Sequence, residues 1–167
     1  AGRQRGAKGL FGWMGKLPWF DENKYLFAYF ISGLILFIFG GVTGIVNASY
    51  SLNSVVHNTA WMPGHFHMTV AGPVFLGIIS MSLYIYTKLS GKRVFLPKLN
   101  TIIPYLWVIG MLIFSFGMSW GGLRGEPRRT NLGTSYLNPD SALYRSDWVP
   151  TTLLALLGGI IMFIAAM

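Results

Sequence analysis

The sequence has no cysteine, few acidic residues and several long stretches without any charge. Because there is no cysteine, neither a disulfide framework nor a thiolate metal site is available, and the redox compartment stays open. Only 11% of the 167 residues are charged and 53% are hydrophobic, whereas a soluble domain usually carries about 25% charged residues. This composition excludes an ordinary soluble domain and indicates a membrane protein.

The few charges that are present are mostly basic, with 13 Lys and Arg against 5 Asp and Glu and a formal net charge of +8. A nucleic-acid-binding surface would need these residues clustered on one folded face. Here they lie between apolar runs, as loop charges beside a membrane do. We therefore expect a lipid bilayer and no nucleic acid as a partner.

Four uncharged apolar runs are each long enough to cross a hydrocarbon core of about 30 Å at about 1.5 Å per residue. These runs predict an all-α membrane protein with four transmembrane helices in residues 25–167, after a basic interfacial lead at residues 1–24. We expect residues 47–63 to form a loop and Pro104 to lie in the first turn of its helix. The expected spans are 25–46, 64–87, 101–122 and 148–167.

Glycine and proline inside the first two runs would weaken a helix in water but are compatible with lipid. Pro73 removes a backbone donor, and the surrounding protein can re-satisfy the carbonyl that this frees. Small residues let neighbouring transmembrane helices approach closely. In the first run these are Gly33, Gly40, Gly41 and Gly44.

The basic residues also predict an orientation. Five lie in residues 1–24 and four in residues 88–100, against none in residues 47–63. Because basic loops stay on the cytoplasmic side, we expect a cytoplasmic N-terminus in a multi-pass protein of a prokaryotic cell membrane. Residues 123–147 then lie on the outer side although they contain four arginines.

All three histidines of the chain lie in one eleven-residue string, His57 to His67. On a helix with about 100° between residues, His65 and His67 project roughly 200° apart and cannot bind one ion. If both are ligands, each serves its own metal centre, and Phe66 faces a third direction, toward neighbouring helices. Intramembrane histidines are candidate functional residues. The alternatives are two structural histidines bonded to the backbone and, for His57, a solvated loop residue.

Four arginines on the outer side need an explanation, because basic residues usually stay on the cytoplasmic side of a membrane. Fixed anionic groups such as haem propionates would supply one, since guanidinium groups bind carboxylates through two parallel hydrogen bonds. Arg128 and Arg129 are the candidate clamp. Alternatively they form an ordinary loop pair, or exposed ion pairs with Glu126 and Asp140 that would contribute only about 0–1 kcal/mol.

The string HNTAWMPGHFH, followed later by EPRR, resembles the catalytic subunit I of haem-copper oxygen reductases, and specifically their B-type branch. The resemblance covers nearly all of the chain, as the last four transmembrane helices of a core that has twelve or more in the family. It implies that His65 is the proximal axial ligand of the high-spin haem, where oxygen is reduced. It implies that His67 is an axial ligand of the low-spin haem that supplies the electrons.

The same resemblance assigns residues on the outer side. It implies that His57 contacts a propionate of the high-spin haem and that Arg128 and Arg129 hold haem propionates. Asn58 stands where the A-type branch has an Asp that helps to bind a Mg ion, so the sequence leaves the Mg site open. The haem types stay open.

Each axial imidazole also needs an acceptor for its other ring N–H, because this bond sets the tautomer and the ligand strength. Backbone carbonyls one turn earlier, or Ser and Thr from another helix, could serve. The sequence does not choose between them.

The resemblance also implies groups for which this chain has no ligands left. Copper at the active centre needs three histidines, and the low-spin haem needs a second axial histidine. We expect these histidines to come from helices outside this sequence, either the rest of a longer subunit I or a second chain. The expected partners are other oxidase subunits and an electron donor that is a cytochrome, a copper protein or a quinol. The expected function is part of a terminal oxidase that reduces O2 to water and translocates protons. The alternatives are a non-catalytic haem-holding electron-transfer subunit and a cofactor-free membrane scaffold.

Overall fold

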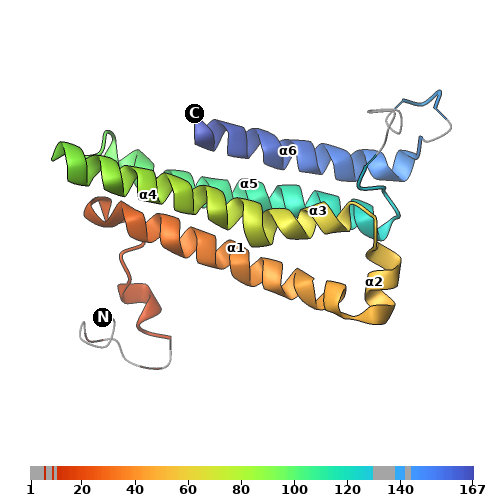
Figure 1. The fold of residues 1–167 in the computed structure, drawn as a ribbon, viewed down its shortest axis with the longest axis horizontal. Helices are drawn as coiled ribbons and strands as arrows, with labels where there is room; N and C mark the ends of the chain where they lie inside the picture. Colours follow the sequence, from red (N-terminus) through yellow and green to blue (C-terminus); the bar gives the residue numbers. More distant parts are fainter. Residues whose placement is uncertain (1–5, 7–8, 10, 130–137, 142–143) are drawn as a thin grey trace.

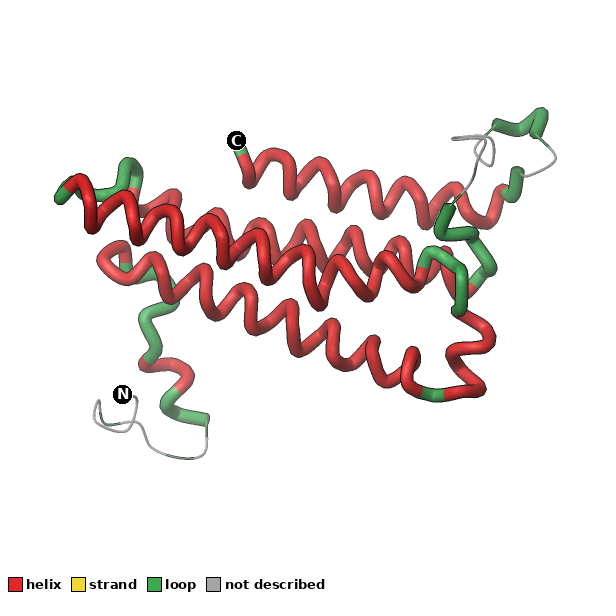
Figure 2. Tube along the Cα trace, viewed as in Figure 1, coloured by secondary structure: helices red, strands yellow, loops and turns green. Residues whose placement is uncertain are grey.

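A computed structural model describes residues 6, 9, 11–129, 138–141 and 144–167, and this part of the chain is almost entirely helical (Figure 2). A five-residue π-helical segment, His67–Ala71, joins α3 to α4 without a break. Short 3-10 turns cover Met14–Lys16, Glu22–Lys24 and Ser146–Trp148. The α-helices are α1 (Tyr25–Ala48), α2 (Tyr50–Val56), α3 (Trp61–Phe66), α4 (Gly72–Ser90), α5 (Pro97–Leu123) and α6 (Val149–Ala166).

The long helices run alternately up and down, side by side, with α3 and α4 forming one rod (Figure 1). Residues 11–24 and the α4–α5 connection lie at one end of the molecule, whereas α2 and the C-terminal end of α5 lie at the other. Within the described residues, four helical stretches are long and apolar enough to cross a membrane: Glu22–Ala48, Trp61–Ser90, Pro97–Leu123 and Ser146–Ala166. The expected all-α membrane fold is confirmed.

The segment 47–63, expected as a loop, is partly helical. It contains α2, and α3 already begins at Trp61. Pro63 therefore lies in the first turn of α3 and does not precede the helix. A proline is tolerated there because the first N–H groups of a helix have no intrahelical partner.

The third long helix also begins earlier than expected, so the placement of Pro104 in a first turn is wrong. Helix α5 starts at Pro97, whose fixed φ suits the first helical position. Pro104 thus lies inside the helix and is buried. The apolar run predicted a later start because Lys98 and Asn100 are polar, but polarity does not exclude residues from a helix that emerges from the membrane.

Pro73 lies directly after the π-helical segment. Local π geometry is one way in which a membrane helix accommodates a proline, because a wider turn relieves the clash and redistributes the freed carbonyls. The α1 helix packs closely at this point, since a Cβ on Gly33 would lie 3.7 Å from Pro73 Cα. This contact sets how α4 packs against α1.

A buried cluster joins all the long helices, and glycines let α5 and α6 approach closely. A Cβ on Gly110 would lie 2.9 Å from Gly158 O, and one on Gly117 would lie 2.7 Å from Ala155 N. Such contacts are the small-residue packing that holds helices together in lipid. The outward faces are apolar, with Phe30 67% exposed, which suits lipid or further helices. The cluster comprises Tyr29, Leu36, Met68, Leu76, Val108, Met111 and Met162.

Candidate functional site

The two intramembrane histidines lie where α3 passes into the π-helical segment. His65 contacts Thr43 of α1. The His67 ring lies against the Phe114 ring of α5, with centroids 4.9 Å apart. The two imidazoles therefore face different neighbouring helices, so each can serve a separate group but they cannot bind one ion together.

The tautomer of His65 follows from counting hydrogens at Thr43. The Thr43 hydroxyl donates to Gly40 O at 2.7 Å, and it has only one hydrogen to give. At its 2.8 Å contact with His65 Nδ1, the Thr43 oxygen is therefore the acceptor and Nδ1–H is the donor. The lone pair of His65 is then on Nε2, where it is available to a metal.

His67 reaches the same tautomer through a different partner. Its Nδ1 lies 2.6 Å from Pro63 O, one helical turn earlier. A carbonyl oxygen can only accept, so Nδ1 carries the hydrogen and Nε2 carries the lone pair. Of the acceptors that the sequence left open, His65 uses a threonine from another helix and His67 uses a backbone carbonyl.

Glycines on α1 make room for the histidine segment. A Cβ on Gly40 would overlap with the Thr69 side chain, and one on Gly44 would lie 3.3 Å from His65 Cε1. Thr69 in turn donates to His65 O at 2.9 Å. The expected close approach is present at both glycines, whereas a Cβ on Gly41 would meet nothing within 4 Å.

The faces of the two imidazoles are only partly covered by this chain. His65 and His67 are both half-buried. Phe66 between them is 52% exposed, so the expected packing of Phe66 against neighbouring helices is not found among the described helices. A mostly apolar cavity of about 430 Å³ lies between α1, α3 and α5, and Thr43 and Met68 line it without either histidine. Within the described part of the chain, no three His, Cys, Asp or Glu side chains gather into a metal site.

The segment with His57 and Asn58 lies directly beside the one with Arg128. The Arg128 N–H donates to Asn58 O at 3.2 Å, and the Ala60 N–H donates to Glu126 O at 2.8 Å. Thr59 and Pro127 form an antiparallel bridge between them. Backbone pairing thus brings together segments about 70 residues apart that the sequence had linked only by resemblance.

The side chains of the four candidate residues in these two segments are exposed: His57, Asn58, Arg128 and Arg129. Asn58 adopts a φ of 62°, a left-handed conformation that Asn tolerates better than most residues. Among the ion pairs between described residues, none joins Arg128 or Arg129 to Glu126 or Asp140. The alternative of an internal ion pair for these arginines therefore finds no support in this part of the chain.

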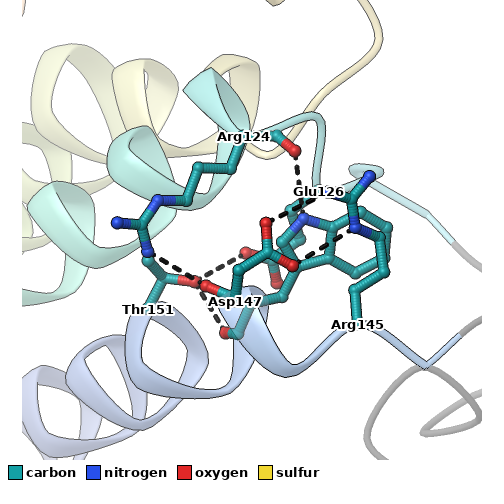
Figure 3. Close-up of polar contacts among 6 residues, drawn as sticks. Arg124, Glu126, Arg145, Asp147 and Thr151 are labelled. Carbon is teal, nitrogen blue, oxygen red and sulfur yellow. Dashed lines mark hydrogen bonds and ion pairs between the residues drawn. The ribbon is translucent and has the colours of Figure 1, made fainter.

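The structure also reveals Glu126, which the sequence had presented only as a possible ion-pair partner. Glu126 is buried, with 6% of its surface exposed, and its carboxyl receives hydrogen bonds from Thr151 and Thr152 at 3.2 and 3.1 Å. Burial raises the pKa of the Glu126 carboxyl above its ordinary value, although these hydrogen bonds act in the opposite direction. Figure 3 shows this carboxyl at the junction of the α5 and α6 ends.

Known proteins resemble the chain along nearly its whole length. Subunit 1 of cytochrome c oxidase from Thermus thermophilus is 41% identical over 167 residues, which cover 99% of this chain and 28% of that protein. A second Thermus thermophilus sequence with the same name is 42% identical over 108 residues, 64% of this chain and 97% of that protein. The relative of the same name from Bacillus subtilis is 30% identical over 122 residues, 72% of this chain and 19% of that protein.

A solved structure agrees with these sequences. A chain of a haem-copper terminal oxidase dimer superimposes with a TM-score of 0.89 and 48% identity over 98% of this chain and 29% of that chain. The present chain thus spans about 28% of the length of the first of these relatives. Since residues 7–161 match the family described as cytochrome c and quinol oxidase polypeptide I, the chain belongs to that family.

Proposed function

We propose that this chain supplies axial haem ligands to the core of a B-type haem-copper terminal oxidase, which reduces O2 to water and translocates protons. The observation that carries the proposal is the pair of imidazoles at His65 and His67. They face different helices, and each has its Nδ1–H bonded and its Nε2 lone pair available. This arrangement suits two haems held on either side of one helix.

The donor set fits haem rather than a metal ion bound by the chain alone. A neutral imidazole is a good haem ligand, and because a porphyrin supplies four nitrogens of its own, each iron would need only one histidine from this chain. When bound, the haems would supply electron transfer and oxygen reduction. We assign His65 to the high-spin haem and His67 to the low-spin haem, with Thr43 and Pro63 O fixing the two rings.

The outer segments would receive the propionates. Arg128 and Arg129 are exposed cations at the end of the molecule that also holds His57 and Asn58. A guanidinium group binds a carboxylate through two parallel hydrogen bonds, so two adjacent arginines can hold propionates of both haems. We assign His57 to a propionate of the high-spin haem. Asn58 lies beside His57 at this place, and the Mg site stays open.

The remaining parts of such a site would come from outside the described helices. All three histidines of this chain have a role, so the copper ligands and the second axial ligand of the low-spin haem belong to further subunit I helices. The half-buried state of His65 and His67 leaves room for those helices. We place the assembly in a prokaryotic cell membrane with residues 1–24 on the cytoplasmic side, alongside other oxidase subunits and a cytochrome, copper protein or quinol as electron donor.

An optical spectrum of the purified assembly that contains this chain tests the proposal. We expect a low-spin haem together with a high-spin haem that binds carbon monoxide after reduction. Low-spin haem alone would favour a non-catalytic electron-transfer subunit, and the absence of any haem absorption would favour a scaffold.

A further inference from the structure

The carboxyl of Glu126 lies in a socket that the ends of α5 and α6 build together. A Cβ on Gly121 would overlap with Glu126 Oε2, so the glycine makes room for the carboxyl. Thr151 Oγ1 lies 3.2 Å from Oε2, and Thr152 Oγ1 lies 3.1 Å from Oε1. The socket contacts both carboxyl oxygens, which a chance burial of a surface side chain would not produce.

Hydrogen counting shows that the socket can hold a neutral carboxyl as well as a carboxylate. Each threonine hydroxyl also lies within reach of Trp148 O, at 2.7 Å for Thr151 and 3.0 Å for Thr152. If the acid is protonated, its O–H donates to Thr151, Thr151 donates to Trp148 O, and Thr152 donates to Oε1. Every hydrogen then has an acceptor without any movement of the side chains.

The charged groups around the socket have other partners. The Arg124 guanidinium lies over the Trp120 ring and donates to Asp147 O at 3.0 Å. Arg145 pairs with Asp147 at 3.2 Å, and the contacts of both arginines with Asp147 are visible in Figure 3. Among the described residues, none of these cations, nor Arg128 or Arg129, forms an ion pair with Glu126. Electrostatic attraction to a nearby cation therefore does not explain the buried carboxyl.

The backbone of Glu126 closes the end of α5. The chain reverses at Gly125, whose φ is 80°, and the Glu126 and Gly125 N–H groups donate to Gly121 O and Gly122 O at 2.9 and 3.0 Å. This pair of hydrogen bonds is a Schellman motif, which satisfies the last carbonyls of the helix. The Glu126 carbonyl also accepts from the Ala60 N–H at 2.8 Å. Glu126 thus joins the ends of α5 and α6 to the start of α3.

We propose that Glu126 is a positioning residue of the outer haem site: its carboxyl, held by Thr151 and Thr152, fixes the loop on which Arg128 lies beside Asn58. The inference rests on the proposed function, because it assumes that the Arg128 guanidinium binds a haem propionate. If the socket is lost, the loop can move away from the end of α6, and the positive charge of Arg128 moves with it.

The test is a redox titration of both haems in the intact oxidase that contains this chain. A positive charge close to a haem favours the reduced form, so its removal lowers the midpoint potential. We expect Arg128→Gln to lower the potential of at least one haem, and Glu126→Ala to lower the same potential. In the double variant Glu126→Ala/Arg128→Gln, the potential should be no lower than in Arg128→Gln alone. The reason is that, without the Arg128 guanidinium, movement of the loop no longer displaces a positive charge.

Two further variants separate positioning from a general loss of structure or of charge. Glu126→Gln keeps an acceptor and a donor in the socket, so it should retain the wild-type potential. Asp147→Asn removes a carboxylate at the same end of the molecule but leaves the socket intact, so it should not lower the potential. If Glu126→Ala does not assemble, Thr152→Val removes one socket bond and should lower the same potential to a smaller extent.

Three results would overturn the proposal: an unchanged potential in Glu126→Ala, or in Thr152→Val if it has to replace that variant; a double variant whose shift is the sum of the single shifts; or an equal shift in Glu126→Gln and Glu126→Ala. Normal haem absorption in each of these cases would leave the proposed function standing. A wild-type assembly without haem absorption would remove both.

Discussion

The hydrogen bond from His65 Nδ1 to Thr43 allows a sharp test of how α1 supports the haem ligand. Thr43→Val has nearly the same shape but removes the oxygen that accepts this bond at 2.8 Å. The Nδ1–H then loses its threonine acceptor in a partly buried place. Loss of the partner of a buried donor costs about 1–3 kcal/mol.

This cost converts into a measurable loss of iron binding. At about 1.4 kcal/mol for each factor of ten, the bond between His65 and a haem iron should weaken about five- to hundredfold. A similar range, about 10- to 100-fold, is typical when the hydrogen-bond partner of a metal-ligating histidine is removed. The imidazole also becomes a weaker electron donor, because the hydrogen bond no longer polarises its ring.

Resonance Raman spectroscopy of the reduced oxidase reports on this bond directly. We expect the iron–histidine stretching band of the high-spin haem to move to lower frequency in Thr43→Val, with a lower ratio of carbon monoxide-binding haem to low-spin haem. Thr87→Val is the matched control, because the Thr87 hydroxyl bonds to Tyr84 O in its own helix. An unchanged band and an unchanged haem ratio in Thr43→Val would refute the role of Thr43.

Three further changes test other parts of the account. Gly40→Ala should destabilise the assembly by about 1–3 kcal/mol, because its Cβ would overlap with Thr69, whereas Gly41→Ala, with open space around its Cβ, should leave the thermal unfolding midpoint unchanged. Burial raises the pKa of Glu126, so the folded state binds the carboxyl proton more tightly than the unfolded state does. The stability that this proton contributes should be complete below the ordinary carboxyl pKa and should decline as the pH rises through the raised pKa. In thermal unfolding measured against pH, Glu126→Gln should abolish this decline. Replacing Arg128 and Arg129 together by Gln should lower the haem potentials in a redox titration, and unchanged potentials would refute the clamp.

The membrane helices could be predicted from the sequence because lipid imposes a simple requirement. Every backbone polar group of a spanning segment must be satisfied internally, so an uncharged run of sufficient length is nearly always a helix. The uncharged runs did not predict where the helices begin and end. Residues 47–63 contain α2, and α5 begins at Pro97, because outside the hydrocarbon core polar residues such as Asn53 or Asn100 can also lie in helices.

The candidate site was predictable only where one helix decides the geometry. The spacing of His65 and His67 predicts that they face different sides, and no other part of the chain is needed for that. Their acceptors, Thr43 and Pro63 O, depend on how α1 packs and on the π-helical segment, which the sequence leaves open.

Glu126 shows where sequence reasoning has the least to work with. An acidic residue before Pro-Arg-Arg resembles an ordinary ion-pair partner, and its burial depends on α6, which lies more than 20 residues further along the chain. The available signals were Gly121-Gly122 at the end of one span and Thr151-Thr152 at the start of the next. They indicate a close helix pair with hydroxyl donors, but only the folded structure shows that the carboxyl lies between them.

Spectra of two single variants, His65→Leu and His67→Leu, test the central claim most directly, that each imidazole binds its own haem. We expect His67→Leu to remove the low-spin haem signal while carbon monoxide still binds to the high-spin haem, and His65→Leu to do the reverse. Wild-type spectra in both variants would contradict the claim.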